Sequence, residues 1–170
     1  PNAPNPARGR LVGPERYLVR TSSNLYGKFS QAIRQGQCGS NAERGLEAME
    51  TALTTSDNGD FLRPEAMLVV IFLTDEDDKV SPVKDYVQVL NTIKPPLANG
   101  MKNWVASFIG ILDVNDTNCS TFGSHIDAGV EYLKLVDYSG GTKESICDAN
   151  FAHAVNNIQK RIIEYATEFR

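Results

Sequence analysis

The chain has no hydrophobic segment long enough to cross a membrane. Its longest uninterrupted apolar run is residues 67–73, whereas a transmembrane helix needs about 20 such residues. The N-terminus also lacks a basic stretch followed by an apolar one, which is the pattern of a secretory signal. We therefore expect neither a membrane span nor a targeting segment within these residues.

Positive charge is also scarce. The 170 residues include 17 Lys and Arg against 21 Asp and Glu, which gives a formal net charge of −4. Because no cluster of Lys and Arg supplies a surface that neutralises phosphates, we expect no nucleic-acid partner. A cation or a protein is the expected partner instead. The length and the 41% hydrophobic content suffice for one globular domain with a core.

Cysteine is rare, with three residues in the chain. Cys119 and Cys147 lie in stretches rich in turn residues, NDTNCSTFGS and SGGTKESICDAN, and could bridge two loops at one end of a sheet. Cys38 would then be left over. Such a bridge indicates a secreted, periplasmic or surface protein, and the alternative is a cytosolic protein with three reduced cysteines.

The spacing of apolar residues predicts alternating helices and strands. Residues 1–16 hold four of the eight prolines and show no periodicity, which indicates an extended arm or loop. Helical spacing follows at 24–34 and again from Asn41. Further patterns predict strands at 67–74, 104–112 and 142–146, and helices from Ser81, over 125–136, and from Phe151 onward.

Strands that alternate with helices indicate an α/β fold, a three-layer α/β/α Rossmann-like architecture with a mostly parallel sheet. The β-branched run at 67–74 lacks alternation, which is typical of a strand buried on both faces. Ligands bind such folds at the carboxyl ends of the strands. There this chain has four consecutive acids, Asp75, Glu76, Asp77 and Asp78. Clustered carboxylates are costly unless a cation or backbone donors offset them.

The order of these segments resembles that of a von Willebrand factor type A domain. The resemblance rests on Gly39-Ser40-Asn41 opening a helix, FLRPEAMLVVIFLTDEDD, the strand WVASFIGI, and GVEYLKLVDYSGGTKESIC before a final helix. The chain is most similar to the branch of secreted or lipid-anchored bacterial surface proteins in which a strand ends in TDEDD or SDEDD. The resemblance extends over nearly the whole chain from Leu11.

The resemblance implies a site for Mg²⁺, or for Mn²⁺ or Ca²⁺, built from three loops at the top of the sheet. Asp75 matches the aspartate of the third loop, and Ser40 lies where the threonine of the second loop is expected. Hard cations prefer such oxygen ligands, and an acidic residue of a protein partner can complete the coordination. Glu76, Asp77 and Asp78 would form an outer acidic rim.

The first loop of that family, Asp-x-Ser-x-Ser, is absent, since residues 1–40 contain no aspartate. In that family, the strand that precedes this loop lies in the middle of the sheet. Without that strand, the strand at 67–74 would have an unpaired edge. We therefore expect residues 17–170 to be the C-terminal part of one domain, whose first strands lie in an N-terminal segment outside this sequence. The metal site depends on that segment. The alternative is a truncated variant that binds no metal here.

Three functional hypotheses follow. The first is a metal-dependent adhesion or protein-binding domain at a cell surface or in the periplasm, which is not an enzyme. The second is an interaction domain with a degenerate, metal-free site. The third is a haloacid dehalogenase-like phosphotransferase, with Asp75 as nucleophile, Asp77 as acid/base and Mg²⁺ at the phosphate. Lys79 stands where that enzyme pattern needs threonine or valine.

Overall fold

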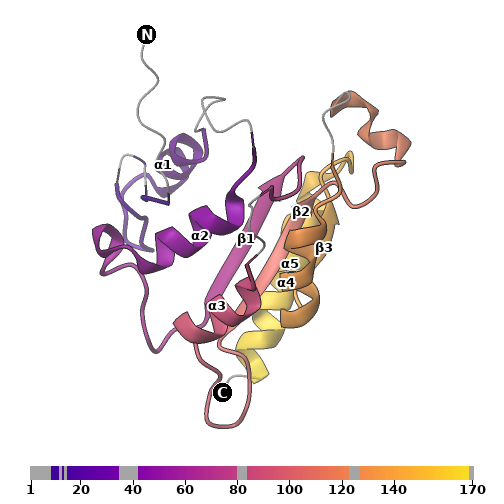
Figure 1. The fold of residues 1–170 in the computed structure, drawn as a ribbon. Helices are drawn as coiled ribbons and strands as arrows, with labels where there is room; N and C mark the ends of the chain where they lie inside the picture. Colours follow the sequence, from indigo (N-terminus) through magenta and orange to yellow (C-terminus); the bar gives the residue numbers. More distant parts are fainter. Residues whose placement is uncertain are drawn as a thin grey trace. The chain divides into compact units, whose positions relative to one another are not determined.

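The computed structural model describes residues 9–11, 13, 15–34, 42–79, 84–122 and 127–168. It divides into two compact units, Pro1–Arg63 and Pro64–Arg170, shown in Figure 1. The elements are α1 (Leu25–Ala32), α2 (Gly45–Thr54), the 3-10 helix η1 (Ser56–Asn58), β1 (Leu68–Thr74), α3 (Tyr86–Ile93), β2 (Trp104–Gly110), the 3-10 helix η2 (Thr117–Phe122), α4 (Val130–Ser139), β3 (Lys143–Ser145) and α5 (Phe151–Glu168). Helices together with parallel strands confirm the α/β class. None of the helices in the described part of the chain has the length and apolar content of a membrane span.

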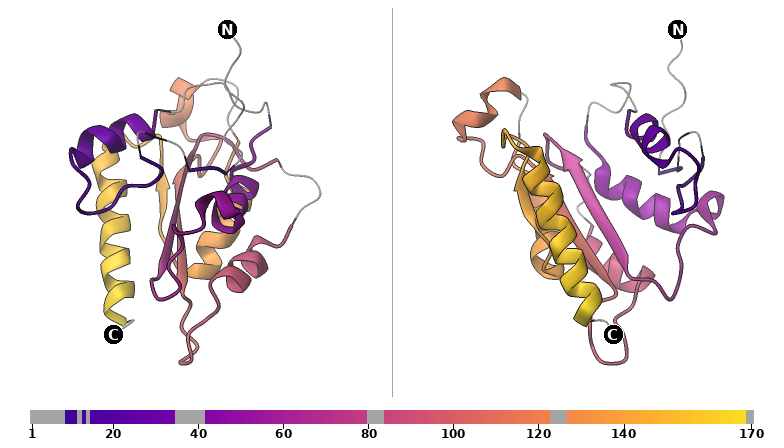
Figure 2. Two further views of the ribbon diagram at one scale, coloured as in Figure 1. Left: turned by 90° about the vertical axis from the view of Figure 1, so that its left-hand side faces the viewer. Right: turned by 180° about the vertical axis from the view of Figure 1, so that it is seen from behind.

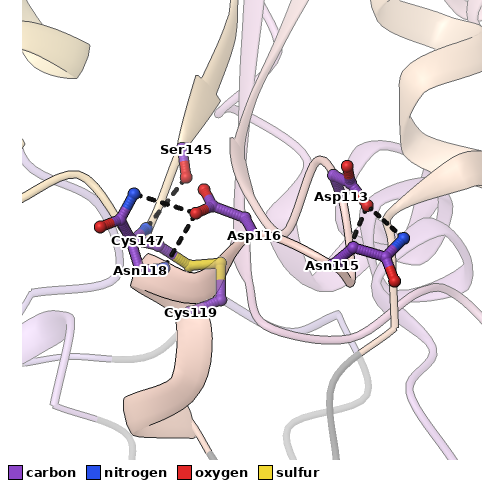
Figure 3. The surroundings of a disulfide bond; sticks show 7 residues. All are labelled: Asp113, Asn115, Asp116, Asn118, Cys119, Ser145 and Cys147. Atoms are coloured by element: carbon purple, nitrogen blue, oxygen red, sulfur yellow. Dashed lines mark hydrogen bonds between the residues drawn. A yellow bond between two sulfur atoms is a disulfide. The ribbon is translucent and has the colours of Figure 1, made fainter.

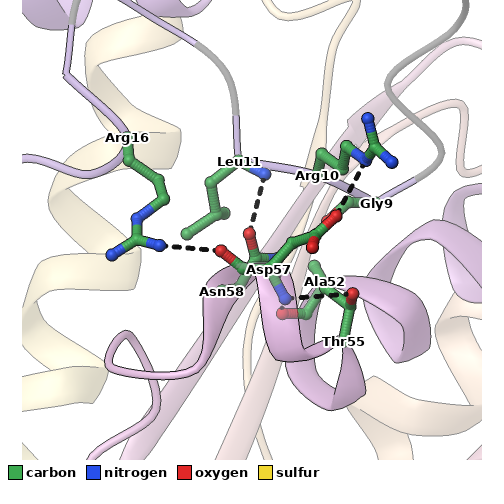
Figure 4. Close-up of polar contacts among 8 residues, drawn as sticks. All are labelled: Gly9, Arg10, Leu11, Arg16, Ala52, Thr55, Asp57 and Asn58. Carbon is green, nitrogen blue, oxygen red and sulfur yellow. Dashed lines mark hydrogen bonds and ion pairs between the residues drawn. The ribbon is translucent and has the colours of Figure 1, made fainter.

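In the first unit, the buried side chain of Asn58 holds the N-terminal arm against η1 (Figure 4). Its Oδ1 accepts the Leu11 N–H at 3.2 Å, and its Nδ2 donates to the carbonyls of Gly9 at 3.0 Å and Ala52 at 2.9 Å. Asn58 is 4% exposed, so these bonds satisfy an amide that water does not reach. The described part of the arm predicted at 1–16 is therefore tied to η1.

The helices of this unit are shorter than predicted. α1 ends at Ala32 instead of residue 34, and none of its residues is buried. The apolar stripe predicted from its spacing is exposed, with Leu25 at 44%, Phe29 at 54% and the C-cap residue Ile33 at 61%. α2 begins at Gly45, and the start predicted at Asn41 lies outside the described residues.

The second unit contains a parallel sheet in the order β1-β2-β3, seen from two sides in Figure 2. β1 and β2 pair in continuous register over all seven residues of each strand. β3 pairs in parallel with the last three residues of β2. The carboxyl ends of the three strands therefore meet at one edge of the sheet, which we call the carboxyl edge.

The buried strand is β2, and the prediction that the strand at 67–74 is buried on both faces was wrong. All seven residues of β2 are buried, because β2 lies between two strands and is covered on its faces by α4 and α5. In β1, Phe72 is buried, but Ile71 and Leu73 are 50% and 59% exposed. Among the described strands, β1 is an outer strand of the sheet.

Helices α4 and α5 pack against β2 from its two faces, because neighbouring residues of a strand point to opposite sides. The ring of Tyr132 in α4 stacks on that of Phe108, with centroids 5.5 Å apart. On the other face, Ala154 and Ile158 of α5 pack against Ile109. The right-hand view of Figure 2 shows β1 beside α5, which does not cover it.

Two helices of this unit begin later than predicted. α3 begins at Tyr86, because the side chain of Asp85 caps it by accepting the Gln88 N–H at 3.1 Å. The start predicted at Ser81 lies outside the described residues. α4 begins at Val130, not at residue 125, and its C-cap Gly140 adopts a φ of 75°. That left-handed conformation favours glycine and ends the helix.

Candidate functional site

The chain turns sharply where β1 ends at the carboxyl edge. The Oγ1 of Thr74, the last residue of β1, accepts the N–H of Glu76 and also donates to the Glu76 carbonyl, both at 3.2 Å. The Asp75 carbonyl then accepts the N–H of Asp127 at 3.4 Å. The four acids after β1 are therefore held beside the segment that leads into α4.

Asp77 caps helix α4. The N-cap residue of α4 is Gly129, which has no side chain that could accept a hydrogen bond. Instead, Oδ1 of Asp77 accepts the N–H of Glu131 at 2.9 Å. The N-terminal turn of a helix has unsatisfied N–H groups and favours negative charge. The carboxylate therefore has a structural role at this position.

The pKa of Asp77 is raised above its ordinary value. Burial is the main cause, and the negative charges of Glu131 and Asp78 raise the pKa further. The hydrogen bonds from the N–H groups of Glu131 and Asp78 act in the opposite direction, because they stabilise the ionised form. Burial dominates this balance, so the folded protein holds this proton more tightly than the unfolded chain does.

Lys79 offsets two acids at the same position. Its Nζ lies 2.7 Å from Oε2 of Glu76 and 3.0 Å from Oδ2 of Asp127. The hydrogen bond to Glu76 and then the one to Asp127 raise the pKa of Lys79. This cation links the loop after β1 to the segment before α4, and it reduces the repulsion among the clustered carboxylates.

The metal ligands implied by the resemblance are described only in part. Asp75 is half-buried at the end of β1, whereas Ser40 and Cys38 lie outside the described residues. Within the described ranges, no group of three or more His, Cys, Asp or Glu side chains is arranged to hold a metal ion. Metal binding by Asp75 and Ser40 therefore stays a prediction.

A disulfide bond joins Cys119 in η2 to Cys147 after β3 (Figure 3). The two residues are 28 positions apart in the sequence, and their Cα atoms are 4.9 Å apart. Cys119 is 1% exposed. The bridge fastens the loop after β2 to the loop after β3 at the carboxyl edge.

Two successive turns shape the loop between β2 and the bridge. Oδ1 of Asp113 accepts the N–H of Asn115 at 2.8 Å, and Oδ1 of Asp116 accepts the N–H of Asn118 at 2.9 Å. Each aspartate also accepts a bond from the side-chain amide of its asparagine, as Figure 3 shows. These aspartates therefore order their own loop.

Sequence reasoning found the acids of the site and missed the groups that stabilise them. Asp127 and Glu131 belong to no sequence pattern that marks a site, and Lys79 is only a mismatch to an enzyme pattern. One signal was available, because Gly129 falls inside the helix predicted over 125–136, and glycine is unfavourable in a helix interior. The cap of α4 comes from Asp77, which lies 54 residues before Glu131 in the sequence.

Comparisons with known proteins do not assign this chain to a family. No protein-family model, curated protein sequence or solved structure matches it. The similarity to von Willebrand factor type A domains therefore rests on the sequence motifs alone.

Proposed function

We propose that this chain is a protein-binding domain that presents its carboxyl edge to a partner and performs no catalysis. The observation that supports this most directly is the Cys119–Cys147 disulfide, which fastens two loops together at that edge. Loops that are already ordered lose less conformational entropy on binding, which favours recognition. The surrounding fold would be the three-layer, von Willebrand type A-like architecture suggested by the sequence.

The exposed groups at this edge suit a partner with basic or hydrogen-bond-donating side chains. Asp113 and Asn115 are exposed on the loop after β2, and Asp148 and Asn150 on the loop after β3. Lys79 is already engaged by Glu76 and Asp127. A complementary surface would therefore carry positive charge, and that charge would guide association as well as fix the orientation.

The form that we propose needs no metal. Glu76 pairs with Lys79, and Asp77 caps α4. Both acids therefore stabilise the folded structure without a metal ion. The metal-dependent form would use Mg²⁺ held by Asp75 and Ser40 to take a carboxylate from the partner. It needs further ligands that the described residues do not bring together. The phosphotransferase hypothesis would require Asp77 to exchange protons while it caps a helix.

A disulfide also suggests where the protein works. Such bonds persist in oxidising compartments and are rare in the cytosol. The proposed domain therefore belongs to a secreted, periplasmic or cell-surface protein.

Panning a phage-displayed peptide library against the immobilised, oxidised chain in Mg²⁺ tests this function. We expect binders that are enriched in basic residues, because the carboxyl edge is acidic. Their capture should fall by about tenfold or more with Asp113→Lys, since reversing one close charge pair costs more than 1.4 kcal/mol. Glu164→Lys, a matched charge reversal on an exposed residue of α5, should leave capture unchanged. Added EDTA should have no effect.

Three results would contradict the proposal. Capture that is equally sensitive to both charge reversals would remove the carboxyl edge as the binding surface. Capture that is lost with EDTA and with Asp75→Ala would establish the metal-dependent form in place of the metal-free one. Turnover of an aryl phosphate that is abolished by Asp75→Asn would show an enzyme.

A further inference from the structure

The sequence contains two Asn-Gly pairs, Asn58-Gly59 and Asn99-Gly100. An asparagine that precedes glycine can react with its own backbone, because the glycine has no Cβ to shield its nitrogen from the asparagine Cγ. The product is a cyclic imide, which water opens to aspartate or isoaspartate. Whether a folded chain permits this reaction depends on how each asparagine side chain is held.

The structure protects the first pair. Asn58 is 4% exposed, and its side chain makes hydrogen bonds to Gly9, Leu11 and Ala52 (Figure 4). Its Cγ can approach the Gly59 nitrogen only after the side chain has left these partners. Reaction at Asn58 therefore requires a local opening of the N-terminal arm from η1.

The second pair lies in a turn between α3 and β2. Asn99 and Gly100 are both exposed in this chain, and Gly100 has a φ of 82°, which glycine adopts without strain. Two backbone hydrogen bonds close the turn, from the Gly100 N–H to the Leu97 carbonyl and from the Leu97 N–H to the Met101 carbonyl, both at 2.8 Å. Exposed turns of this kind open at a low cost in free energy.

The side chain of Asn99 is held far less firmly than that of Asn58. Its Oδ1 accepts the Met101 N–H at 3.0 Å, and this is its one hydrogen bond among the contacts of the described residues. The bond draws electron density from Cγ, the carbon that the Gly100 nitrogen would attack. A Cβ built at Gly100 would also meet no atom within 4 Å beyond its chain neighbours, so no other part of the described chain crowds the turn.

We propose that Asn99 is a site of spontaneous deamidation in the folded chain, with the Gly100 nitrogen as the nucleophile. This nitrogen forms a bond to Cγ of Asn99 and gives up its proton to solvent, while the bond between Cγ and Nδ2 breaks and ammonia leaves. Water then opens the imide at either carbonyl carbon. The net reaction consumes a water and releases an ammonia, and it needs no oxidant or reductant.

The modification changes the amino end of the sheet and not the carboxyl edge. Asn99 and Gly100 precede β2, whereas the carboxyl edge lies where that strand ends. Each product carries a new negative charge, and isoaspartate also adds a methylene to the backbone path. The enzyme class that recognises the isoaspartyl product is the protein-isoaspartate methyltransferases.

Peptide mapping by mass spectrometry measures both sites in one sample, after the full 170-residue chain has been kept folded at mildly alkaline pH. We expect aspartate and isoaspartate to accumulate at position 99. Deamidation of Asn58 should be slower by about tenfold or more, because three hydrogen bonds must break first. In urea, where neither side chain is held, the two rates should become similar. A protein-isoaspartate methyltransferase should label the position-99 peptide of the folded sample.

Two alanine variants form a matched pair. Gly100→Ala places a Cβ beside the attacking nitrogen and should remove most of the product at position 99, whereas Gly59→Ala makes the same change beside Asn58 and should leave that product unchanged. Alanine is strained at a φ of 82°, so circular dichroism checks that Gly100→Ala is folded. Asn99→Gln keeps both the amide and Gly100, and it should also abolish the product, because the larger imide ring closes far more slowly.

The proposal fails if Asn99 stays intact in the folded chain while the unfolded chain deamidates there. Equal rates at Asn58 and Asn99 in the folded chain would also overturn it, because hydrogen bonding would then not determine which site reacts. Product at position 99 that persists in Gly100→Ala would indicate direct hydrolysis of the amide by water in place of attack by the Gly100 nitrogen.

Discussion

Asp77 lies three residues after the end of β1, yet it hydrogen-bonds a backbone amide 54 residues further along the chain. That contact explains why an acid can be half-buried in a cluster of like charges. The amide of Glu131 compensates for part of the lost hydration, and α4 gains the cap that Gly129 cannot supply. In the same loop, the Lys79 ammonium pairs with the Glu76 carboxylate. Each of these two acids therefore has its own local partner.

Replacing Asp77 tests the cap directly. Asp77→Ala leaves the Glu131 N–H without its acceptor, and we expect the free energy of unfolding at neutral pH to fall by about 1 kcal/mol. Asp77→Asn keeps an acceptor oxygen and should lose less. Urea denaturation of the three proteins measures both differences. Equal losses in the two variants would show that charge, and not the hydrogen bond, is what α4 requires.

The difference in stability between the wild type and Asp77→Asn should depend on pH. The pKa of Asp77 is raised above 3.8 in the folded state. Its contribution to stability is therefore fully present below 3.8 and is lost as the pH rises through the folded pKa. The stability of the wild type relative to Asp77→Asn should fall as the pH rises from 3.8 through the pKa of Asp77 in the folded protein, and it should then level off. A relative stability that rises with pH would contradict the role of burial.

At the scale of elements, hydrogen bonds join the C-terminal end of α4 to β2. The Oγ of Ser139 accepts the N–H of Ala106 at 2.9 Å, inside the buried strand. Tyr165 of α5 donates to the Ser139 carbonyl at 2.8 Å. Gly141 then passes so close to β2 that a Cβ there would lie 1.8 Å from the Ala106 carbonyl oxygen. One short segment therefore joins a helix, a strand and a second helix.

Ser139→Ala should be among the more damaging small substitutions in the second unit. It leaves the N–H of Ala106 without a partner, and an unsatisfied buried donor costs about 1 to 3 kcal/mol. Thr92→Ala is the control, since its exposed hydroxyl bonds only within α3. Urea denaturation should show a loss of stability for Ser139→Ala alone. Equal effects would mean that the Ala106 amide does not depend on this hydroxyl.

The elements that the sequence predicts well are those whose own residues determine them. The apolar run around β2 and the long amphipathic pattern of α5 were identified within a few residues of their observed bounds. α4 was placed too early, because its start depends on Asp77, a residue distant in sequence. The burial of β1 was also overestimated. Its composition is that of an inner strand, but the described sheet gives it only one neighbour.

At the scale of the whole chain, the surface that we propose for partner binding is the carboxyl edge of the second unit. The sequence predicts that edge correctly in outline, because strand ends and acids can be located from composition and spacing. It does not predict that Lys79 and the start of α4 compensate those acids, since this requires loops to meet in three dimensions. The cysteine pair lies between these cases. Turn-rich surroundings suggested it, and the structure brings the two residues together.

Removing the Cys119–Cys147 disulfide should affect both the stability of the fold and the binding loops. Closing a loop of 28 residues restricts the unfolded chain, which corresponds to about 3 to 4 kcal/mol of stability. We expect the double variant Cys119→Ala/Cys147→Ala to lose about this amount in urea denaturation. Reduction of the wild-type chain with dithiothreitol should cause a similar loss, and the double variant should not respond to the reductant.

If the bridge also holds the binding loops in place, captured peptides should dissociate faster from the double variant at temperatures where it remains folded. Unchanged dissociation in the folded variant would limit the disulfide to stability and would remove the main support for the proposed binding surface.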